Sequence, residues 1–232
     1  MTTTRKLILG LGGLVVLGVG AFLVWFFLIK ADPKPPLSAK DLDKSLAGKK
    51  KTAGSSTSDT PLDGSWTISP DSTVGYRIKE TIAGLPDDAV GRSNAATGTL
   101  TIAGGRATAA TFSVEVATIK SDSGLRDSRL PGLMDTATFP TAKFALTSPI
   151  PLGSVPADGV PRKFTATGDL TLHGTTKSVT FPLEAKITNG RIGVLGSIKV
   201  TFADYGISNP SNAITTVGDT GTLEFVLVFD HK

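Results

Sequence analysis

The chain has 232 residues, of which 40% are hydrophobic and none is cysteine, and its formal net charge is +4. The missing thiol excludes disulfides, thiolate zinc sites, cysteine nucleophiles and anchoring through a lipidated cysteine. Residues 1–61 hold nine basic and four acidic side chains, whereas residues 62–232 hold fifteen and sixteen. The excess positive charge therefore lies outside the part that can fold, and we do not expect a nucleic-acid-binding domain.

An uncharged apolar run from Leu7 to Ile29 opens the chain, between Arg5-Lys6 and Lys30. A helix over this run would extend about 34 Å, enough to cross a hydrocarbon core about 30 Å thick. The alternative, a cleaved signal peptide, has a shorter apolar stretch and a small-x-small site, whereas this run is bulky to its end. We therefore predict that residues 1–30 are a retained transmembrane anchor. Lysines also follow the run, so charge alone leaves the topology undecided.

Residues 31–61 have the composition of a linker. Pro33, Pro35 and Pro36 prevent the continuation of a helix, and residues 49–58 are small and polar. A short helix over residues 37–46 would have little to bury. The sequence thus predicts a flexible linker that keeps the following domain beside the bilayer and lets it turn. The lysines at 49–51 are either contacts to anionic head groups or part of a solvated spacer.

Residues 62–232 contain short runs in which apolar and polar side chains alternate, as in half-buried strands. The runs lie at 66–68, 73–79, 97–102, 111–116, 143–146, 163–172, 179–187, 192–202 and 223–229. Turn sequences separate several of them, including the Asn-Gly pair at 189–190. About eight or nine antiparallel strands predict a sandwich or a closed barrel. Residues 121–139 do not alternate, and we expect there a loop with one turn of helix, a candidate flap over an opening.

Signatures of catalysis and of metal binding are missing from the sequence. It has no phosphate-binding glycine loop, no His-Glu-x-x-His, no Gly-x-Ser-x-Gly and no carboxylates spaced for a metal. His173 falls in a predicted solvated turn and His231 near the end of the chain, so neither has the burial that tunes a catalytic base. Asp87 and Asp88 follow a Gly-Leu-Pro stretch that predicts an exposed loop. We therefore predict no catalytic residue, no metal site and no cofactor.

Five ordered motifs between residues 65 and 230 resemble the YceI-like family. They are Trp66 with Asp71-Ser72-Thr73, Thr118-Ile119-Lys120-Ser121 with Arg126-Asp127, Phe139-Pro140-Thr141-Ala142-Lys143-Phe144, Gly168-Asp169-Leu170-Thr171-Leu172-His173-Gly174-Thr175-Thr176-Lys177, and Asp204-Tyr205-Gly206-Ile207. The resemblance implies that residues 62–232 form a lipocalin-like antiparallel barrel of about eight strands, outside the cytoplasm. It also implies an apolar interior that holds a polyisoprenoid chain, such as an isoprenoid quinone or a prenyl lipid, and no catalysis.

The chain departs from the family pattern at two places. Phe202 stands where the family often has an arginine, and Leu133-Met134 stands where a pair of phenylalanines is common. The first change removes a charge that could anchor a polar head group, and the second replaces rigid rings with flexible side chains.

The inward set of the alternating strands, with two flap residues, supplies the predicted lipid-binding residues. They are Tyr76, Ile78, Phe112, Val114, Leu133, Met134, Phe144, Phe164, Leu172, Phe181 and Phe225. From the residues alone, a solid core made of the same side chains is the stronger alternative, and the resemblance makes a cavity about equally favoured. Two other functions stay open: a surface-anchored protein-interaction module with a filled barrel, and an ester hydrolase with His173 as its base. The oligomeric state cannot be predicted.

Overall fold

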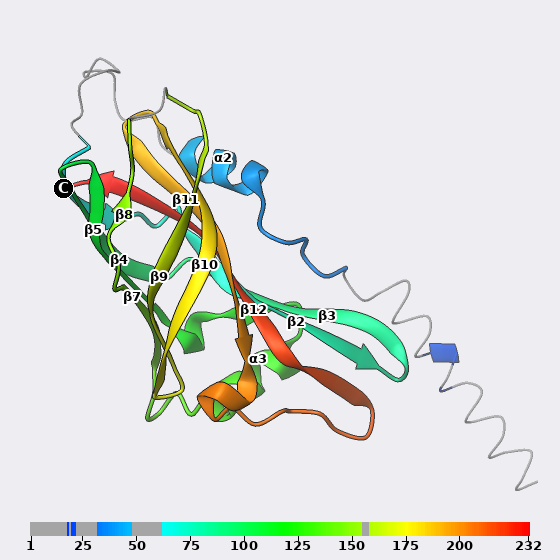
Figure 1. Cartoon of the computed structure of the whole chain (residues 1–232). Coiled ribbons are helices and arrows are strands. Elements are labelled where there is room, and N and C mark those ends of the chain that lie inside the picture. Colours follow the sequence, from blue (N-terminus) through cyan, green and yellow to red (C-terminus); the bar gives the residue numbers. More distant parts are fainter. Residues whose placement is uncertain (1–17, 19, 22–31, 48–61, 155–157) are drawn as a thin grey trace, which may run out of the picture. The chain divides into compact units, whose positions relative to one another are not determined.

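A closed antiparallel barrel of eight strands forms the body of the protein in the computed structural model, which describes residues 18, 20–21, 32–47, 62–154 and 158–232 (Figure 1). Around the barrel the strands are β1 (Gly64–Ile68), β4 (Ala96–Ala103), β5 (Arg106–Glu115), β7 (Thr141–Leu146), β9 (Arg162–Leu172), β10 (Thr175–Thr188), β11 (Arg191–Thr201) and β12 (Thr215–His231). Pairing of β1 with β12 closes the ring, with Trp66 opposite His231. The predicted all-β barrel of about eight strands is thereby confirmed.

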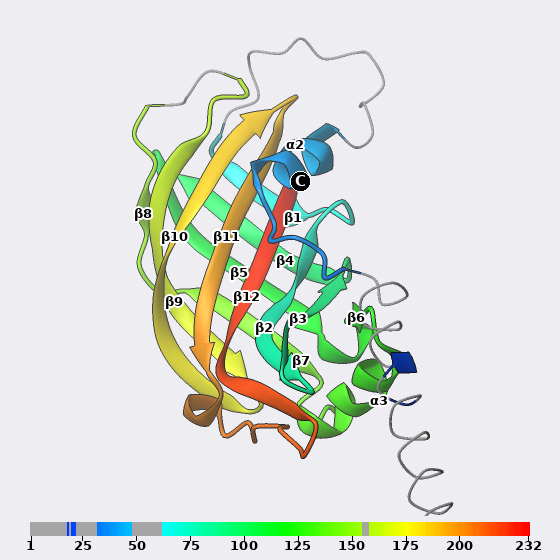
Figure 2. The same ribbon diagram turned by 90° about the vertical axis from the view of Figure 1, so that its right-hand side faces the viewer.

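One edge of strand β12 pairs with β11, and its other edge pairs with two different strands. Its end pairs with β1 at residues 229–231, whereas residues 215–226 pair with β2 (Thr73–Ile82). The sheet continues from β2 to β3 (Leu85–Ser93) and β6 (Lys120–Ser121), and β8 (Ile150–Pro151) pairs with β5. Figure 2 shows β2 and β3 beside the lower half of β12. The barrel wall therefore branches at one end.

Helix α2 (Ala39–Ala47) packs on the outer surface of β11 and β12 (Figure 2). Leu42 and Leu46 are buried against Val226 and Val228, which are fully buried although they alternate with inward-facing residues of β12. A Cβ atom at Gly193 would lie 2.7 Å from a methyl group of Leu42, so the glycine lets the helix approach β11 closely. The helix thus has an apolar surface to bury, contrary to the sequence-based expectation.

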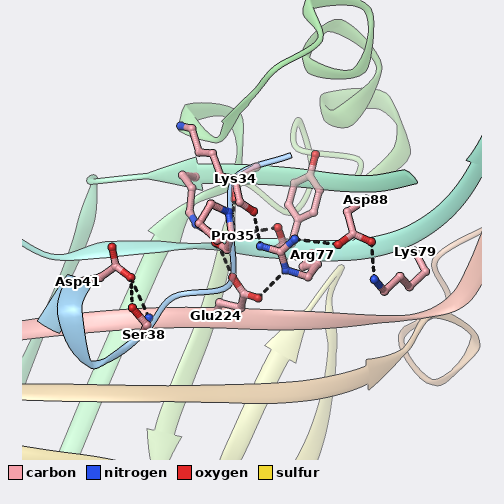
Figure 3. A network of polar contacts seen from close by, with 11 residues as sticks. Lys34, Pro35, Ser38, Asp41, Arg77, Lys79, Asp88 and Glu224 are labelled. Carbon is pink, nitrogen blue, oxygen red and sulfur yellow. Dashed lines mark hydrogen bonds and ion pairs between the residues drawn. The ribbon is translucent and has the colours of Figure 1, made fainter. Parts of the chain in front are cut away.

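A buried ion cluster holds the segment that precedes α2 (Figure 3). Glu224, whose side chain is 6% exposed, pairs with Arg92 and with Arg77, the latter at 2.9 Å. Arg77 Nη2 donates a hydrogen bond to the Lys34 carbonyl at 2.6 Å, and Arg92 donates to the Pro35 carbonyl. Residues 34–47 are therefore docked on the barrel, whereas the predicted linker was flexible from 31 to 61. Residues 48–61 of that linker lie outside the described residues.

Asp87 and Asp88 lie within β3, not in the exposed loop that the preceding Gly-Leu-Pro stretch predicted. The side chain of Asp88 is 18% exposed and contacts Arg77 and Lys79 (Figure 3). Burial raises the pKa of Asp88, but hydrogen bonds from Lys79 and Arg77 outweigh burial and hold the pKa below its ordinary value. The turn residues instead form the tight connection between β2 and β3, where Ala83 and Gly84 have positive φ.

Helix α3 (Gly124–Leu133) lies at the end of the barrel away from α2 (Figure 1). It is a longer helix than the single turn expected there. Ser123 caps its first turn by accepting a hydrogen bond from the Arg126 N–H, and Pro131 lies in its last turn. Two short 3-10 turns, η2 (Val116–Thr118) and η3 (Phe202–Tyr205), lie at the same end of the strands.

Candidate functional site: an apolar cavity above four phenylalanines

Four phenylalanine rings meet in the middle of the barrel and form a closed ring of contacts, which we call the phenylalanine quartet. Phe112 of β5 and Phe144 of β7 have centroids 5.3 Å apart, and Phe144 and Phe181 of β10 are 5.4 Å apart. Phe225 of β12 completes the ring, 5.9 Å from Phe181 and 5.6 Å from Phe112. These spacings are those of attractive edge and offset ring pairs. The quartet is a packed layer across the barrel.

Two glycines make room for the quartet. A Cβ atom at Gly168 of β9 would lie 2.4 Å from the Phe144 ring, and one at Gly196 of β11 would lie 2.4 Å from the Phe225 ring. Gly196 is the direct cross-strand partner of Phe225. Larger residues at these positions would push the rings out of the layer.

A cavity of about 130 Å³ lies on the α2 side of the quartet. Its wall is apolar, and the lining residues that sequence reasoning did not list include Leu100, Ile102, Ala166, Leu183, Ile192 and Leu227. Polar members of the lining are Thr111, Ser154, Arg162 and Lys186, and among the described residues no carboxylate lines the cavity. Lys186 lies in the outward-facing set of β10, where its ammonium pairs with Asp43 of α2. The cavity can therefore hold an apolar group. Among the described lining residues, Arg162 is the charged residue that belongs to an inward-facing set.

Five of the predicted lipid-binding residues line this cavity: Phe112, Phe144, Phe164, Phe181 and Phe225. Val114 and Leu172 are buried in the core of the barrel but do not line the cavity, and Ile78, Leu133 and Met134 pack against that core. Tyr76 lies over Gly91 beside Ile119, near α3. The structure thus separates the predicted set into a cavity group and a core group, and the lipid-binding role of each residue stays a prediction.

Residues of three motifs that carry the family resemblance meet at the other end of the barrel, whereas Trp66 and Asp71 of the first motif lie on the α2 side. The rings of Phe139 and His173 are 5.4 Å apart and meet edge to face, and His173 Nδ1 is 3.2 Å from the Tyr205 carbonyl oxygen. A Cβ atom at Gly174 would lie 2.4 Å from the Phe139 ring, and Gly206 adopts a left-handed conformation with φ 64°. His173 is half-buried in this contact, not solvated as predicted. Phe139, His173, Gly174, Tyr205 and Gly206 hold strand ends together and do not line the cavity, whereas Phe144, the last residue of the Phe-Pro motif, does.

A polar cluster fastens α3 to β2. Arg126 pairs with Glu80 at 2.7 Å and with Asp122 at 2.5 Å, whereas Asp127 accepts hydrogen bonds from Ser121. Arg126 and Asp127, which are adjacent in the sequence, therefore have different partners. Burial raises the pKa of Glu80, which the Arg126 charge opposes, and burial raises the pKa of the Tyr76 hydroxyl to about 12.

Phe202 and the Leu133-Met134 pair, at which the sequence departs from the family pattern, serve the core. Phe202 is 8% exposed and belongs to the same core as Val114. The phenyl ring of Phe202 thus extends the apolar core at the position where the family often has an arginine. Among residues 32–47, 62–154 and 158–232, no group of three or more His, Asp or Glu residues is arranged to hold a metal ion.

Within the part of the chain that the structure describes, no helix has the length and apolar character needed to cross a membrane. The predicted anchor falls on residues 7–29, which, apart from residues 18, 20 and 21, lie outside the described part.

Comparison with known proteins identifies a YceI-like domain at residues 66–229. The chain is 35% identical over 121 residues to a UPF0312 protein of Pseudomonas fluorescens, which covers 49% of this chain and 59% of the relative. It is 36% identical over 99 residues to a UPF0312 protein of Pseudomonas syringae, covering 40% and 48%. The matches thus span about half the length of these curated relatives.

Two solved structures have a similar fold. A polyisoprenoid binding domain from Saccharophagus degradans, implicated in plant cell wall breakdown, superposes with a TM-score of 0.59 at 17% identity, over 73% of this chain and 99% of that domain. Burkholderia cenocepacia BcnA gives a TM-score of 0.55 at 20% identity, over 69% and 98%. At these identities the likeness concerns the fold.

Proposed function

The chain belongs to the YceI-like domain family, and we propose that it is a membrane-anchored protein that binds the apolar chain of a polyisoprenoid lipid inside the barrel. The observation that carries the proposal is the apolar cavity above the phenylalanine quartet. A protein of the same fold is described as a polyisoprenoid binding domain, which supports this ligand class. The resemblance at the level of motifs points to the same class, and storage or transport of the lipid is the corresponding role.

The size of the cavity limits how much of a lipid it receives without rearrangement. A cavity of about 150 Å³ lined by Leu, Ile and Phe holds one benzene molecule, and the cavity here is about 130 Å³. It therefore accommodates one terminal group of a prenyl chain. A longer buried chain requires the quartet rings to move, because the quartet bounds the cavity on the side of the barrel interior.

The apolar run at residues 7–29 is the proposed anchor, with the barrel outside the cytoplasm. Its length suits a bilayer, and without a cysteine the chain has no thiol for lipidation. Fusion of a C-terminal reporter that is active only outside the cytoplasm tests this arrangement. Reporter activity confined to the cytoplasm would overturn it.

The ligand proposal is tested by expressing the full chain in a bacterial host, extracting the purified protein with organic solvent and analysing the extract by mass spectrometry. We expect a prenyl lipid in stoichiometric amount. Ala110→Phe, which places a ring in the cavity, should remove most of the lipid, whereas Thr165→Phe, on the exposed outer side of β9, should not. A wild-type extract without prenyl lipid would refute the proposal and favour a protein-interaction module.

A further inference from the structure

Arg162 lines the apolar cavity at the end of the barrel where β9 begins. It is the first residue of β9 and shares the inward-facing set with Phe164 and Ala166, all three of which line the cavity. Its Nη1 donates hydrogen bonds to the carbonyl oxygens of Leu152, at 3.2 Å, and Ser154, at 2.6 Å. The side chain is thus fixed in place through one of its three nitrogens.

Other arginines in similar surroundings are neutralised by carboxylates. Among the described arginines that are not fully exposed, Arg77, Arg92, Arg126 and Arg191 each pair with at least one Asp or Glu, whereas Arg162 pairs with none. A partly desolvated cation without a counter-charge is costly, and an incoming anion recovers that cost. The exception therefore points to a ligand.

The free edge of Arg162 defines the chemistry of that ligand. The two carbonyl oxygens occupy Nη1. Nε and Nη2 have no hydrogen-bond partner among the described residues, and these two nitrogens form one edge of the guanidinium group. Two parallel donors of this kind match a phosphate or carboxylate. With no carboxylate among the described lining residues, nothing there repels an anion.

We propose that the cavity binds an amphiphile tail first, and that Arg162 holds its anionic head group at the end of the barrel where β9 begins. The inference rests on the proposed function and deepens it, because it separates prenyl phosphates from neutral prenyl alcohols and quinones. A fatty acid would present the same charge with a different tail, so the experiment includes both sources of an anionic head.

The test measures binding of radiolabelled geranyl phosphate, geraniol, decanoate and decanol to the full chain in phosphatidylcholine nanodiscs, with empty nanodiscs as the blank. We expect geranyl phosphate to bind about tenfold or more tightly than geraniol, since charged hydrogen bonds from Arg162 favour the phosphate. Arg162→Gln should abolish that preference. Decanoate bound more tightly than geranyl phosphate, with the same dependence on Arg162, would support the anionic head and assign it to an acyl chain.

Lys163→Gln is the matched control, because it removes one positive charge from the adjacent, exposed position of the same strand. It should leave the preference intact. Urea unfolding shows whether Arg162→Gln is folded, and Arg162→Lys, which keeps the charge without the fork, should restore part of the preference. Equal binding of geranyl phosphate and geraniol to the wild type would overturn this inference and leave the proposed function standing. Binding of none of the four compounds would overturn both.

Discussion

Removal of one ring from the phenylalanine quartet should destabilise the barrel and deepen its cavity. Phe181 is 4% exposed and contacts both Phe144 and Phe225. Replacement of a buried phenylalanine by alanine costs about 3–5 kcal/mol of unfolding free energy. The upper part of that range is expected for Phe181→Ala, because the new space joins the existing cavity of about 130 Å³ and has fewer rings to collapse against.

The assay is urea unfolding of the wild type and of Phe181→Ala, each with and without a prenyl alcohol. The enlarged cavity should bind a longer chain, and a ligand at a hundred times its Kd returns about 2.7 kcal/mol. Phe164→Ala is the control, since Phe164 lines the cavity but belongs to no quartet contact and is less buried. A loss below 1 kcal/mol for Phe181→Ala, with no change in the preferred chain length, would refute the quartet as the floor of the cavity.

Three further predictions concern the quartet, the docked helix α2 and the polar cluster at α3. Gly196→Ala should lower stability by about 1–3 kcal/mol in urea unfolding because its methyl group meets the Phe225 ring, whereas Gly132→Ala in α3, with open space around it, should not. Leu42→Ala should cost about 2–5 kcal/mol and expose residues 34–47 to limited proteolysis, whereas unchanged cleavage would contradict the docking of α2. Burial raises the folded-state pKa of Glu80 above its unfolded value, so the stability that the protonated carboxyl contributes is lost as pH rises through the folded-state pKa. In urea unfolding from pH 4 to 7, the unfolding free energy of Glu80→Gln should therefore change less with pH than that of the wild type. Identical pH dependence of the two proteins would contradict the burial of the carboxyl.

The strand pattern predicted an antiparallel sandwich or closed barrel, because alternation reports which side chains face inward, and the family resemblance favoured the barrel. Alternation could not predict the level of a residue along the barrel axis. Val114 and Phe112 have the same inward direction on β5, yet Phe112 lines the cavity, whereas Val114 is buried in the core and does not line it. That difference depends on how β5 is staggered against its neighbours, which the sequence of one strand does not contain.

The docked helix α2 did have a signal in the sequence. Residues 225–229 are apolar without alternation, and such a run indicates a strand covered on both faces. The inward residues of this run face the cavity, and the outward Val226 and Val228 meet α2. The partner itself could not be identified, because α2 is only nine residues long and is separated from β12 by most of the chain. Strand β3 was missed for another reason: it starts with turn residues and contains Pro86.

The position of β12 in the barrel sets the order in which the chain can fold. This strand pairs with β11, β1 and β2, and Val228 N–H donates to the Ser72 hydroxyl across 156 residues of sequence. None of these long-range contacts can form before residues 215–231 have left the ribosome, so β1 and β2 must wait with open edges. Such topology folds slowly. The barrel can therefore close only after the whole of β12 has been synthesised, because this strand supplies the pairing that joins both sides of the ring.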